Sequence, residues 1–217
     1  MKKTPEILYE DNHLLVVNKP ANMPTQQDSS NDLDLLTWAK DFLKKKYNKP
    51  GNVYCGLVHR LDRPVSGIIV LAKTSKAASR LSNQIRLNSM RKKYTAVVEG
   101  NVMEATWQDY LAKNEKTNNS YVTTKDKGKY SELTILKSEP LNSTQSLITI
   151  DLKTGRSHQI RVQCASRNHP IVGDQRYHPH PQKNQQIRLL AHELSFSHPT
   201  TKEELTFKIE YPSWFLK

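Results

Sequence analysis

One carboxylate, Asp62, stands among basic residues in the segment GLVHRLDRPVSG at positions 56–67. Arg60 and Arg63 lie close to it in sequence, and the apolar run IIVLA follows at positions 68–72. Nearby positive charges favour the ionised form of a carboxyl group, so Asp62 can remain a carboxylate nucleophile at neutral pH. The segment also fits a turn in which an aspartate pairs with an arginine, so the motif by itself leaves both interpretations open.

The phenol of Tyr94 is a second group that could do chemistry. It follows the basic tripeptide RKK at positions 91–93 and opens a predicted strand over residues 94–100. An aromatic residue at the start of a strand agrees with ordinary β-propensity. The same ring could also stack on a nucleobase, and its hydroxyl could exchange a proton with that base.

A third segment, LKTGRSHQIRVQ at positions 152–163, contains two arginines near the predicted start of a helix. Gly155 permits a tight turn from strand to helix, and Ser157 is the predicted first residue of that helix. Arg161 would then project from the first turn toward whatever the preceding loop faces. Arg156 fits an exposed side chain that binds a phosphate, and the free N–H groups of a helix N-terminus also suit an anion.

The composition indicates a basic protein with an acidic partner. Lys and Arg total 33 against 21 Asp and Glu, which gives a formal net charge of +12 over 217 residues. Nucleic acid is the most common partner of such a surface. The hydrophobic content of 36% is enough for a core, and no apolar run approaches the length that spans a bilayer. The start of the chain shows no secretory signal, so we expect a cytoplasmic location and no membrane association.

The cysteines and histidines do not form a recognisable metal site. Cys55 and Cys164 are not part of a CxxC pair, and no disulfide is expected in a chain without an export signal. No histidine has HxxxH or HExxH spacing, although six are crowded into the last third of the sequence: His158, His169, His178, His180, His192 and His198. The sequence therefore predicts no metal site.

The elements that must position these groups are short strands with a few helices between them. Helices are predicted from apolar spacing and caps over residues 33–47, 75–88 and 157–166. Strands are predicted at positions 7–9, 14–18, 68–72, 94–100, 131–137, 146–152, 189–196 and 205–209. This order indicates an α+β fold with a mixed, mostly antiparallel sheet and flanking helices.

Two local features of this arrangement are also predicted. The side chains of Leu36, Ala39, Leu43 and Tyr47 recur at helical spacing and are expected to form a stripe in the core. The segment at positions 114–129 is polar and basic, and it is expected to be a mobile hairpin or loop.

Several segments, taken together, resemble the RluA-type RNA pseudouridine synthases. They follow one another in the family's order: DNHLLVVNKP at 11–20, HRLDR at 59–63 with the Ser-Gly pair at 66–67, the Lys-Tyr pair at 93–94, TGRSHQIR at 154–161, HPIVGD at 169–174 and AHELSFSHP at 191–199. The resemblance runs from about residue 7 to residue 212. The chain departs from the family at Asn22, Val65 and Gln163, where glycine, threonine and histidine are frequent. These differences concern loop geometry and substrate choice, because none falls on a residue that the resemblance marks as catalytic.

The resemblance implies isomerisation of uridine to pseudouridine in ribosomal or transfer RNA, without cofactor or metal. Asp62 matches the family's essential aspartate, which either attacks C1′ of the ribose or removes the 2′ proton. Tyr94 matches the tyrosine that stacks on the uracil and removes the C5 proton. Arg161 matches the basic residue that pairs with the aspartate, and Arg60 matches the residue that enters the RNA stack as the target uridine leaves it.

The resemblance also implies one catalytic domain over residues 1–217, with a central basic cleft around the aspartate. The first matching segment begins near residue 7, so no N-terminal S4-like RNA-binding module is expected, and a monomer without an obligate protein partner is expected. The segment 114–129 is a candidate reader of RNA shape. From charge and position, further candidate contacts to the RNA backbone are Arg63, Arg91, Lys92 and Arg156.

Two other functions fit parts of the sequence. A non-catalytic RNA-binding module or chaperone on the same fold would share the positive charge, but the presence of Asp62, Tyr94 and Arg161 argues against it. A metal-dependent hydrolase would have to use the C-terminal histidines, whose spacing does not favour it.

Overall fold

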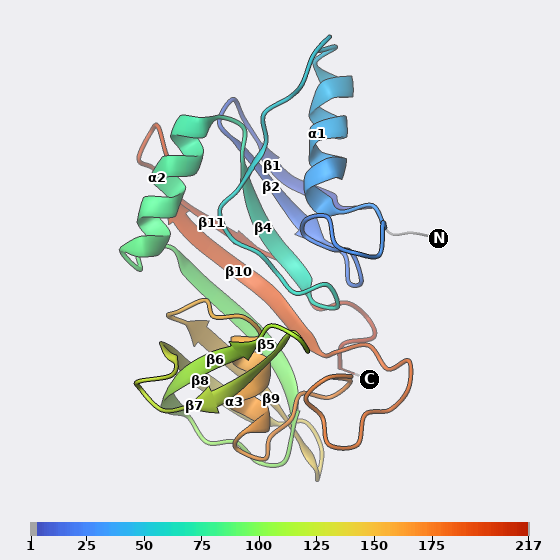
Figure 1. Ribbon diagram of the computed structural model, residues 1–217, viewed down its shortest axis with the longest axis vertical. Helices are drawn as coiled ribbons and strands as arrows, with labels where there is room; N and C mark the ends of the chain where they lie inside the picture. The colour runs from blue at the N-terminus through green and yellow to red at the C-terminus, as the bar shows by residue number, and fades with distance from the viewer. Residues whose placement is uncertain (1–3, 217) are drawn as a thin grey trace. The chain divides into compact units, whose positions relative to one another are not determined.

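The computed structural model describes residues 4–216, and the chain divides into two compact units. The first unit contains residues up to 90 together with 191–209, and the second contains residues 91–190 and those from 210 onward. Figure 1 shows the elements of both units in chain order by colour. The two units are described one after the other.

The first unit is built on a sheet in which the strands run in the order β1, β2, β4, β10. The short strand β3 pairs with β4, and β11 pairs with β10. The β1–β2 and β2–β4 pairs are antiparallel. The strands of this unit are β1 (Glu6–Glu10), β2 (Leu14–Lys19), β3 (Gly56–Leu57), β4 (Ser66–Ala72), β10 (Leu189–Ser197) and β11 (Glu204–Lys208).

The core of the first unit lies around β2 and β4, whose side chains are buried on both faces of the sheet. This explains why these strands read as continuous apolar runs and not as alternating ones. Helix α2 (Ser75–Arg86), capped by Thr74, buries Ala77 and Leu81 in a cluster with Leu14, Val70 and Phe196.

Helix α1 (Leu35–Lys46) begins after Asp34, whose carboxylate accepts a hydrogen bond from the backbone N–H of Thr37. Three lysines in its last turn suit the negative end of the helix dipole. The predicted apolar stripe is only partly correct. Ala39 and Leu43 are buried, but Leu35 takes the place predicted for Leu36, and Tyr47 is 46% exposed. The hydroxyl of Tyr47 donates to Glu10, which draws this ring out of the core.

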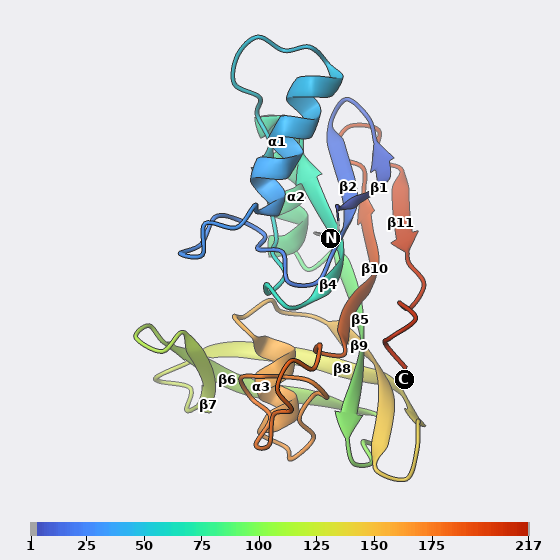
Figure 2. The same cartoon turned by 90° about the vertical axis from the view of Figure 1, so that its right-hand side faces the viewer.

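The second unit is an antiparallel sheet with strand order β5, β9, β8, β6, β7. Helix α3 (Gln159–Ala165) packs against β6 and β7 (Figure 2). Burial alternates along β9, as expected for a sheet with one covered face. The strands are β5 (Arg91–Glu99), β6 (Ala105–Asn114), β7 (Asn119–Thr123), β8 (Lys129–Pro140) and β9 (Gln145–Leu152).

The α+β class and the mostly antiparallel pairing are confirmed, and each predicted helix and strand is present within a few residues. Strands β3, β6 and β7 were missed. The segment 114–129 contains a turn and then β7, which pairs with β6. Helix α3 begins at Gln159, and not at Ser157, because the backbone of His158 is left-handed, with φ of 52°. No helix among residues 4–216 combines the length and the apolar character needed to cross a membrane.

Candidate functional site

The structure places the predicted site residues in both units. Asp62, Arg60 and Arg63 lie on the loop between β3 and β4 in the first unit. The second unit contains the others, on β5 and around α3: Lys92, Tyr94, Arg156 and Arg161. Each group is therefore described within its own unit.

The loop that carries Asp62 is fixed on both sides of this residue. On the N-terminal side, the buried Thr25 hydroxyl donates to the carbonyl of Leu61 at 2.7 Å and accepts from the N–H of Leu61 at 3.3 Å. On the C-terminal side, the N–H of the buried Val65 donates to the carbonyl of Asp62 at 3.0 Å. The backbone on which the Asp62 carboxylate stands is therefore held in one conformation.

A buried lysine lies under the same loop. Lys19, at the end of β2, is 0% exposed, and its ammonium group donates to the carbonyls of Pro20 at 3.0 Å, Met23 at 2.8 Å and Arg63 at 3.3 Å. Burial lowers the pKa of Lys19 to about 7, although the negative charge of Asp62 acts in the opposite direction. Lys19 is therefore electrostatically coupled to Asp62 and is hydrogen-bonded to the loop that carries it.

Sequence reasoning did not assign a role to Lys19, although the residue lay in the segment 11–20 that resembles the family. One signal was present. Lys19 follows the apolar run Leu14-Leu15-Val16-Val17 and precedes a proline, so it marks the end of a buried strand. Backbone carbonyls beyond that end have no partners in the sheet and need another hydrogen-bond donor.

The arginines next to Asp62 behave differently from one another. Arg63 turns toward the loop before α1, where its guanidinium pairs with Asp28 at 3.3 Å and with Asp32, and donates to the hydroxyl of Ser30 at 2.7 Å. The ion pair with Asp32 is the main reason that the pKa of Arg63 is raised. The side chain of Arg60 is exposed. Contacts of either residue with RNA stay predictions.

His59 has a structural contact. Its Nε2 atom accepts a hydrogen bond from the backbone N–H of Val70, at 3.1 Å. An accepting nitrogen carries no proton, so this bond favours the neutral ring protonated at Nδ1. His59 thereby ties the loop of Asp62 to β4.

In the second unit, Tyr94 is 7% exposed and pairs with Ile150 across the β5–β9 ladder. The register places Tyr94 on the same face of the sheet as Leu152. Leu152 pairs with Leu133 and Leu133 pairs with Trp107, so these side chains share that face. Helix α3 covers this face, since the Gln163 amide donates to the carbonyl of Trp107 at 3.4 Å. Tyr94 and the helix of Arg161 thus lie on one side of this sheet.

The turn before α3 is built by Thr154 and Gln159. The Thr154 hydroxyl donates to the side-chain carbonyl of Gln159 at 2.8 Å, and the N–H of Arg156 donates to the same oxygen at 3.0 Å. The exposed Arg156 donates from Nε to the carbonyl of Tyr130 at 2.8 Å.

Lys92 lies on β5. Burial lowers the pKa of its ammonium group, and the negative charge of Asp151 opposes this shift. These contacts leave the predicted RNA binding by Arg156 and Lys92 untested.

Arg161 is the most tightly held of the predicted residues. Its Nε and Nη2 atoms donate to the two carboxylate oxygens of Asp174, at 2.8 and 2.7 Å, and both side chains are buried. Burial acts to raise the pKa of Asp174, but hydrogen bonds from Arg161 and its positive charge outweigh that effect and hold the pKa below its usual value. Sequence reasoning had left Asp174 without a catalytic role. The predicted pairing of Arg161 with Asp62 stays a prediction.

Other reactive groups in the described part of the chain are not arranged for catalysis. Residues 4–216 contain no group of three His, Cys, Asp or Glu side chains placed to hold a metal ion. Cys55 and Cys164 are free and buried, and burial raises their pKa values to about 11 and about 12. Thiols with such pKa values are poor nucleophiles at neutral pH.

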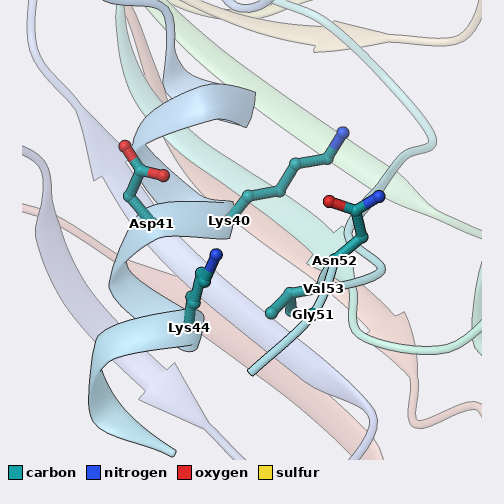
Figure 3. A pocket seen from close by; sticks show the side chains of 6 residues that line it. All are labelled: Lys40, Asp41, Lys44, Gly51, Asn52 and Val53. Atoms are coloured by element: carbon teal, nitrogen blue, oxygen red, sulfur yellow. The ribbon is translucent and has the colours of Figure 1, made fainter. Parts of the chain in front are cut away.

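The first unit also contains a cavity of about 360 Å³ between α1 and the loop that precedes β3 (Figure 3). Its lining consists of Lys40, Asp41, Lys44, Gly51, Asn52 and Val53. The Lys40 side chain extends toward Asn52 across the cavity. None of the predicted site residues lines this cavity, so it does not mark the position of the predicted chemistry.

Comparison with known proteins gives consistent results. A family model described as RNA pseudouridylate synthase matches residues 13–166. The chain is 33% identical to the ribosomal large subunit pseudouridine synthase C of Buchnera aphidicola subsp. Acyrthosiphon pisum, over 93% of its own length and 66% of that relative. It is also 33% identical to the dual-specificity RNA pseudouridine synthase RluA of Haemophilus influenzae, over 93% of the chain and 91% of the relative.

Solved structures agree on the fold. The human RNA pseudouridylate synthase domain containing 4 superposes with a TM-score of 0.79 at 21% identity, over 97% of this chain and 90% of that one. The human RNA pseudouridylate synthase domain containing 1 gives 0.73 at 23% identity, over 96% and 84%. At this identity the likeness concerns the fold alone.

Proposed function

The chain belongs to the RNA pseudouridylate synthase family, and from this premise we propose that it isomerises uridine to pseudouridine in ribosomal or transfer RNA. The observation that carries the proposal is the match to the family model over residues 13–166, a range that includes Asp62, Tyr94 and Arg161. The name of one relative refers to the large ribosomal subunit, which supports ribosomal RNA as a substrate, and the name of another refers to dual specificity.

The reaction breaks the N1–C1′ glycosidic bond and joins C5 of the same uracil to C1′. The proton lost from C5 is balanced by one gained at N1, so no oxidant, reductant or water is consumed. We assign to Asp62 either attack on C1′ or removal of the 2′ proton, and both require an ionised carboxylate. The backbone around Asp62 is fixed by Thr25 and Lys19, which supports an oriented carboxylate at this position.

Tyr94 and Arg161 have the remaining proposed roles. Tyr94 would stack on the uracil and remove the C5 proton, and its low exposure would keep the ring in a fixed position. Arg161 would pair with the carboxylate that reacts. Its bidentate contact with Asp174 holds the guanidinium in one orientation, which suits a group that must align a carboxylate.

The target uridine must leave its stack, because C1′ and C5 are not both accessible within an RNA helix. Extrusion costs a few kcal/mol, and least in a loop or bulge. We propose that Arg60, which is exposed, enters the stack in its place. Contacts of Lys92 and Arg156 with phosphates would offset part of the remaining cost and would make binding sensitive to salt. Arg63 would add to them only on release from Asp28 and Asp32.

We further propose that the protein acts in the cytoplasm as a monomer, without metal or cofactor. The isomerisation needs no redox partner, and the net charge of +12 suits RNA as the partner. Light scattering of the purified protein measures its mass in solution, and activity in the presence of a chelator tests the independence from metal.

The test of the proposed function compares wild type with Asp62→Asn on in vitro transcripts of large-subunit ribosomal RNA and of transfer RNA. Pseudouridine is detected by carbodiimide adducts that stop reverse transcription. We expect site-specific pseudouridine with wild type and a rate at least about a thousandfold lower with Asp62→Asn, because loss of a nucleophile removes a catalytic unit. Asp41→Asn, an exposed carboxylate on α1, is the matched control.

Equal activity of Asp62→Asn and wild type would disprove the assignment of the nucleophile. RNA binding by wild type without any pseudouridine on either transcript would favour the non-catalytic RNA-binding module instead.

A further inference from the structure

Asp174 is held in place by the backbone around it. Gly173 precedes it with φ of 78°, and a Cβ atom at this glycine would lie 2.2 Å from the carbonyl oxygen of Gln186. Only glycine fits such a position. The Asp174 side chain is fully buried, and besides Arg161 it binds the backbone N–H groups of Arg176 at 2.9 Å and Tyr177 at 3.2 Å. One carboxylate therefore fixes both the arginine of α3 and the segment 174–177.

Tyr177 extends this contact in two directions. The guanidinium carbon of Arg161 lies 5.1 Å from the centre of the Tyr177 ring, within the range of a cation–π contact. The Tyr177 hydroxyl accepts a hydrogen bond from the backbone N–H of Ser120 at 2.8 Å and lies 2.7 Å from Nδ1 of His158. The same side chain thus touches the guanidinium, strand β7 and the residue that precedes α3.

Arg176 makes a second link to the same hairpin. Its Nη1 atom donates to the carbonyl of Thr117 at 3.0 Å and to the side-chain oxygen of Asn119. The turn that joins β6 to β7 is therefore bound by Arg176, and β7 directly after the turn is bound by Tyr177. Arg161 is bound by Tyr177 and Asp174. A movement of this turn displaces the atoms that hold Arg161.

We propose that Asp174 and Tyr177 are positioning residues that hold the Arg161 guanidinium and couple it to the β6–β7 turn at residues 114–119. Asp174 sets the orientation of the guanidinium. Tyr177 transmits the position of the turn to it through its hydroxyl group. This turn belongs to the segment proposed to read RNA shape, so RNA bound there acts on Arg161. The effect of this coupling on catalysis rests on the proposed function. The coupling between the turn and the Arg161 guanidinium does not.

The first experiment measures the coupling without catalysis. The Nε–H resonance of Arg161 is recorded in protein with isotope-labelled arginine and assigned by its loss in Arg161→Lys. The variant Tyr177→Phe retains the ring under the guanidinium and removes the hydroxyl, with its contacts to Ser120 and His158. We expect this resonance to shift in Tyr177→Phe and in Asn119→Ala, which removes the acceptor for Arg176. We expect the chemical shift of this resonance to be unchanged in Tyr130→Phe, which removes the hydroxyl of an exposed tyrosine on β8.

The second experiment measures catalysis on in vitro transcribed large-subunit ribosomal RNA under single-turnover conditions. We expect Tyr177→Phe to lower the rate at saturating RNA about tenfold and the RNA affinity less than twofold, because a positioning defect acts on the chemical step. Tyr130→Phe should keep the wild-type rate. Thermal melting of each variant confirms that it is folded.

The outcomes separate the two levels of the proposal. An Arg161 resonance that is unchanged in Tyr177→Phe, or that shifts no more than in Tyr130→Phe, overturns the coupling. A shifted resonance with a wild-type rate overturns its catalytic meaning. If wild type forms no pseudouridine, the proposed function fails, and the resonance still decides whether the turn and Arg161 are coupled.

Discussion

Each unit buries one positively charged side chain beside the proposed chemistry, and the two units neutralise that charge differently. In the first, the ammonium of Lys19 donates to three backbone carbonyls. In the second, the guanidinium of Arg161 meets the carboxylate of Asp174 through two parallel hydrogen bonds. Carbonyl dipoles replace part of the water that a cation loses on burial, whereas a carboxylate supplies a full opposite charge.

The consequence of this difference is a difference in titration. The pKa of Lys19 falls to about 7, so this buried charge changes within the physiological range. Arg161 stays protonated, and the pKa of Asp174 is lowered, so the second pair stays ionised until the solution is strongly acidic. The loop of Asp62 is thus held by the Lys19 ammonium, which loses its charge as the pH rises through about 7. Arg161 is held by the Asp174 carboxylate, which keeps its charge at neutral and alkaline pH.

The largest expected effect comes from breaking the pair in the second unit. Asp174→Asn leaves the charge of Arg161 buried beside a neutral amide, and we expect the free energy of unfolding to fall by about 3–5 kcal/mol. Urea denaturation measures this change. Asp126→Asn, which removes an exposed carboxylate from the same unit, should alter it by less than about 0.5 kcal/mol.

A second variant distinguishes the ion pair from the packing around it. Replacing both partners, as in Asp174→Leu with Arg161→Met, removes the unpaired charge and should recover most of the lost stability. If Asp174→Asn costs less than about 1 kcal/mol, the carboxylate does not hold Arg161 in the way that the distances indicate.

A smaller effect is expected from Lys19, and it depends on pH. As the pH rises through about 7, the ammonium loses one of the protons that it donates to the carbonyls, including that of Arg63 next to Asp62. We expect the rate of pseudouridine formation by wild type to fall about three- to tenfold between pH 6 and pH 9 from this cause. Lys19→Met should be slower at pH 6 and should lack this descending limb in single-turnover assays.

Stability gives an independent check with a definite sign. The pKa of Lys19 is lower in the folded state, about 7, than its ordinary value of 10.5, so the unfolded chain binds more protons between these limits. The free energy of unfolding should therefore rise with pH from about 7 to about 10, by on the order of a few kcal/mol relative to Lys19→Met. Asp174 changes stability in the same direction over a lower range of pH, because the pKa of its carboxyl group is lowered on folding, so its contribution is present at neutral pH and is lost in acid. A flat difference between wild type and Lys19→Met across this range would show that Lys19 is not buried as a cation.

The pattern of the sequence was sufficient for the core of the first unit and insufficient for the second. The apolar runs of β2 and β4 predict buried strands because nearly every position in them is buried. Strand β6, by contrast, alternates Trp107 and Leu111 with polar side chains, and one of these, the partly buried Asp109, binds Gln163 and Arg167 of the α3 region. A polar residue whose partner lies more than fifty positions away leaves no local signal.

The same limit applies to the candidate site. Asp62, Tyr94 and Arg161 stand out because their residue types and neighbours suggest chemistry, and the resemblance selects them. Lys19 and Asp174 could not be assigned from local pattern, since each acquires its role from contacts with residues distant in sequence. The start of α3 was misplaced for a related reason. His158 adopts a left-handed backbone next to the Tyr177 hydroxyl, a contact that no rule for helix caps includes.

The smallest expected effect concerns the two arginines beside Asp62, which are equivalent in sequence and different in structure. Arg60 is exposed, and Arg63 is already bound to Asp28, Asp32 and Ser30. We expect Arg60→Gln to weaken binding to a ribosomal RNA transcript by about three- to tenfold and to lower the slope of log K against log salt by about 0.7–0.9. Arg63→Gln should weaken binding less than about twofold, because RNA would have to displace two carboxylates to reach this guanidinium. Fluorescence anisotropy over a salt series measures both, and an equal loss in Arg63→Gln would mean that the loop before α1 releases Arg63 when RNA binds.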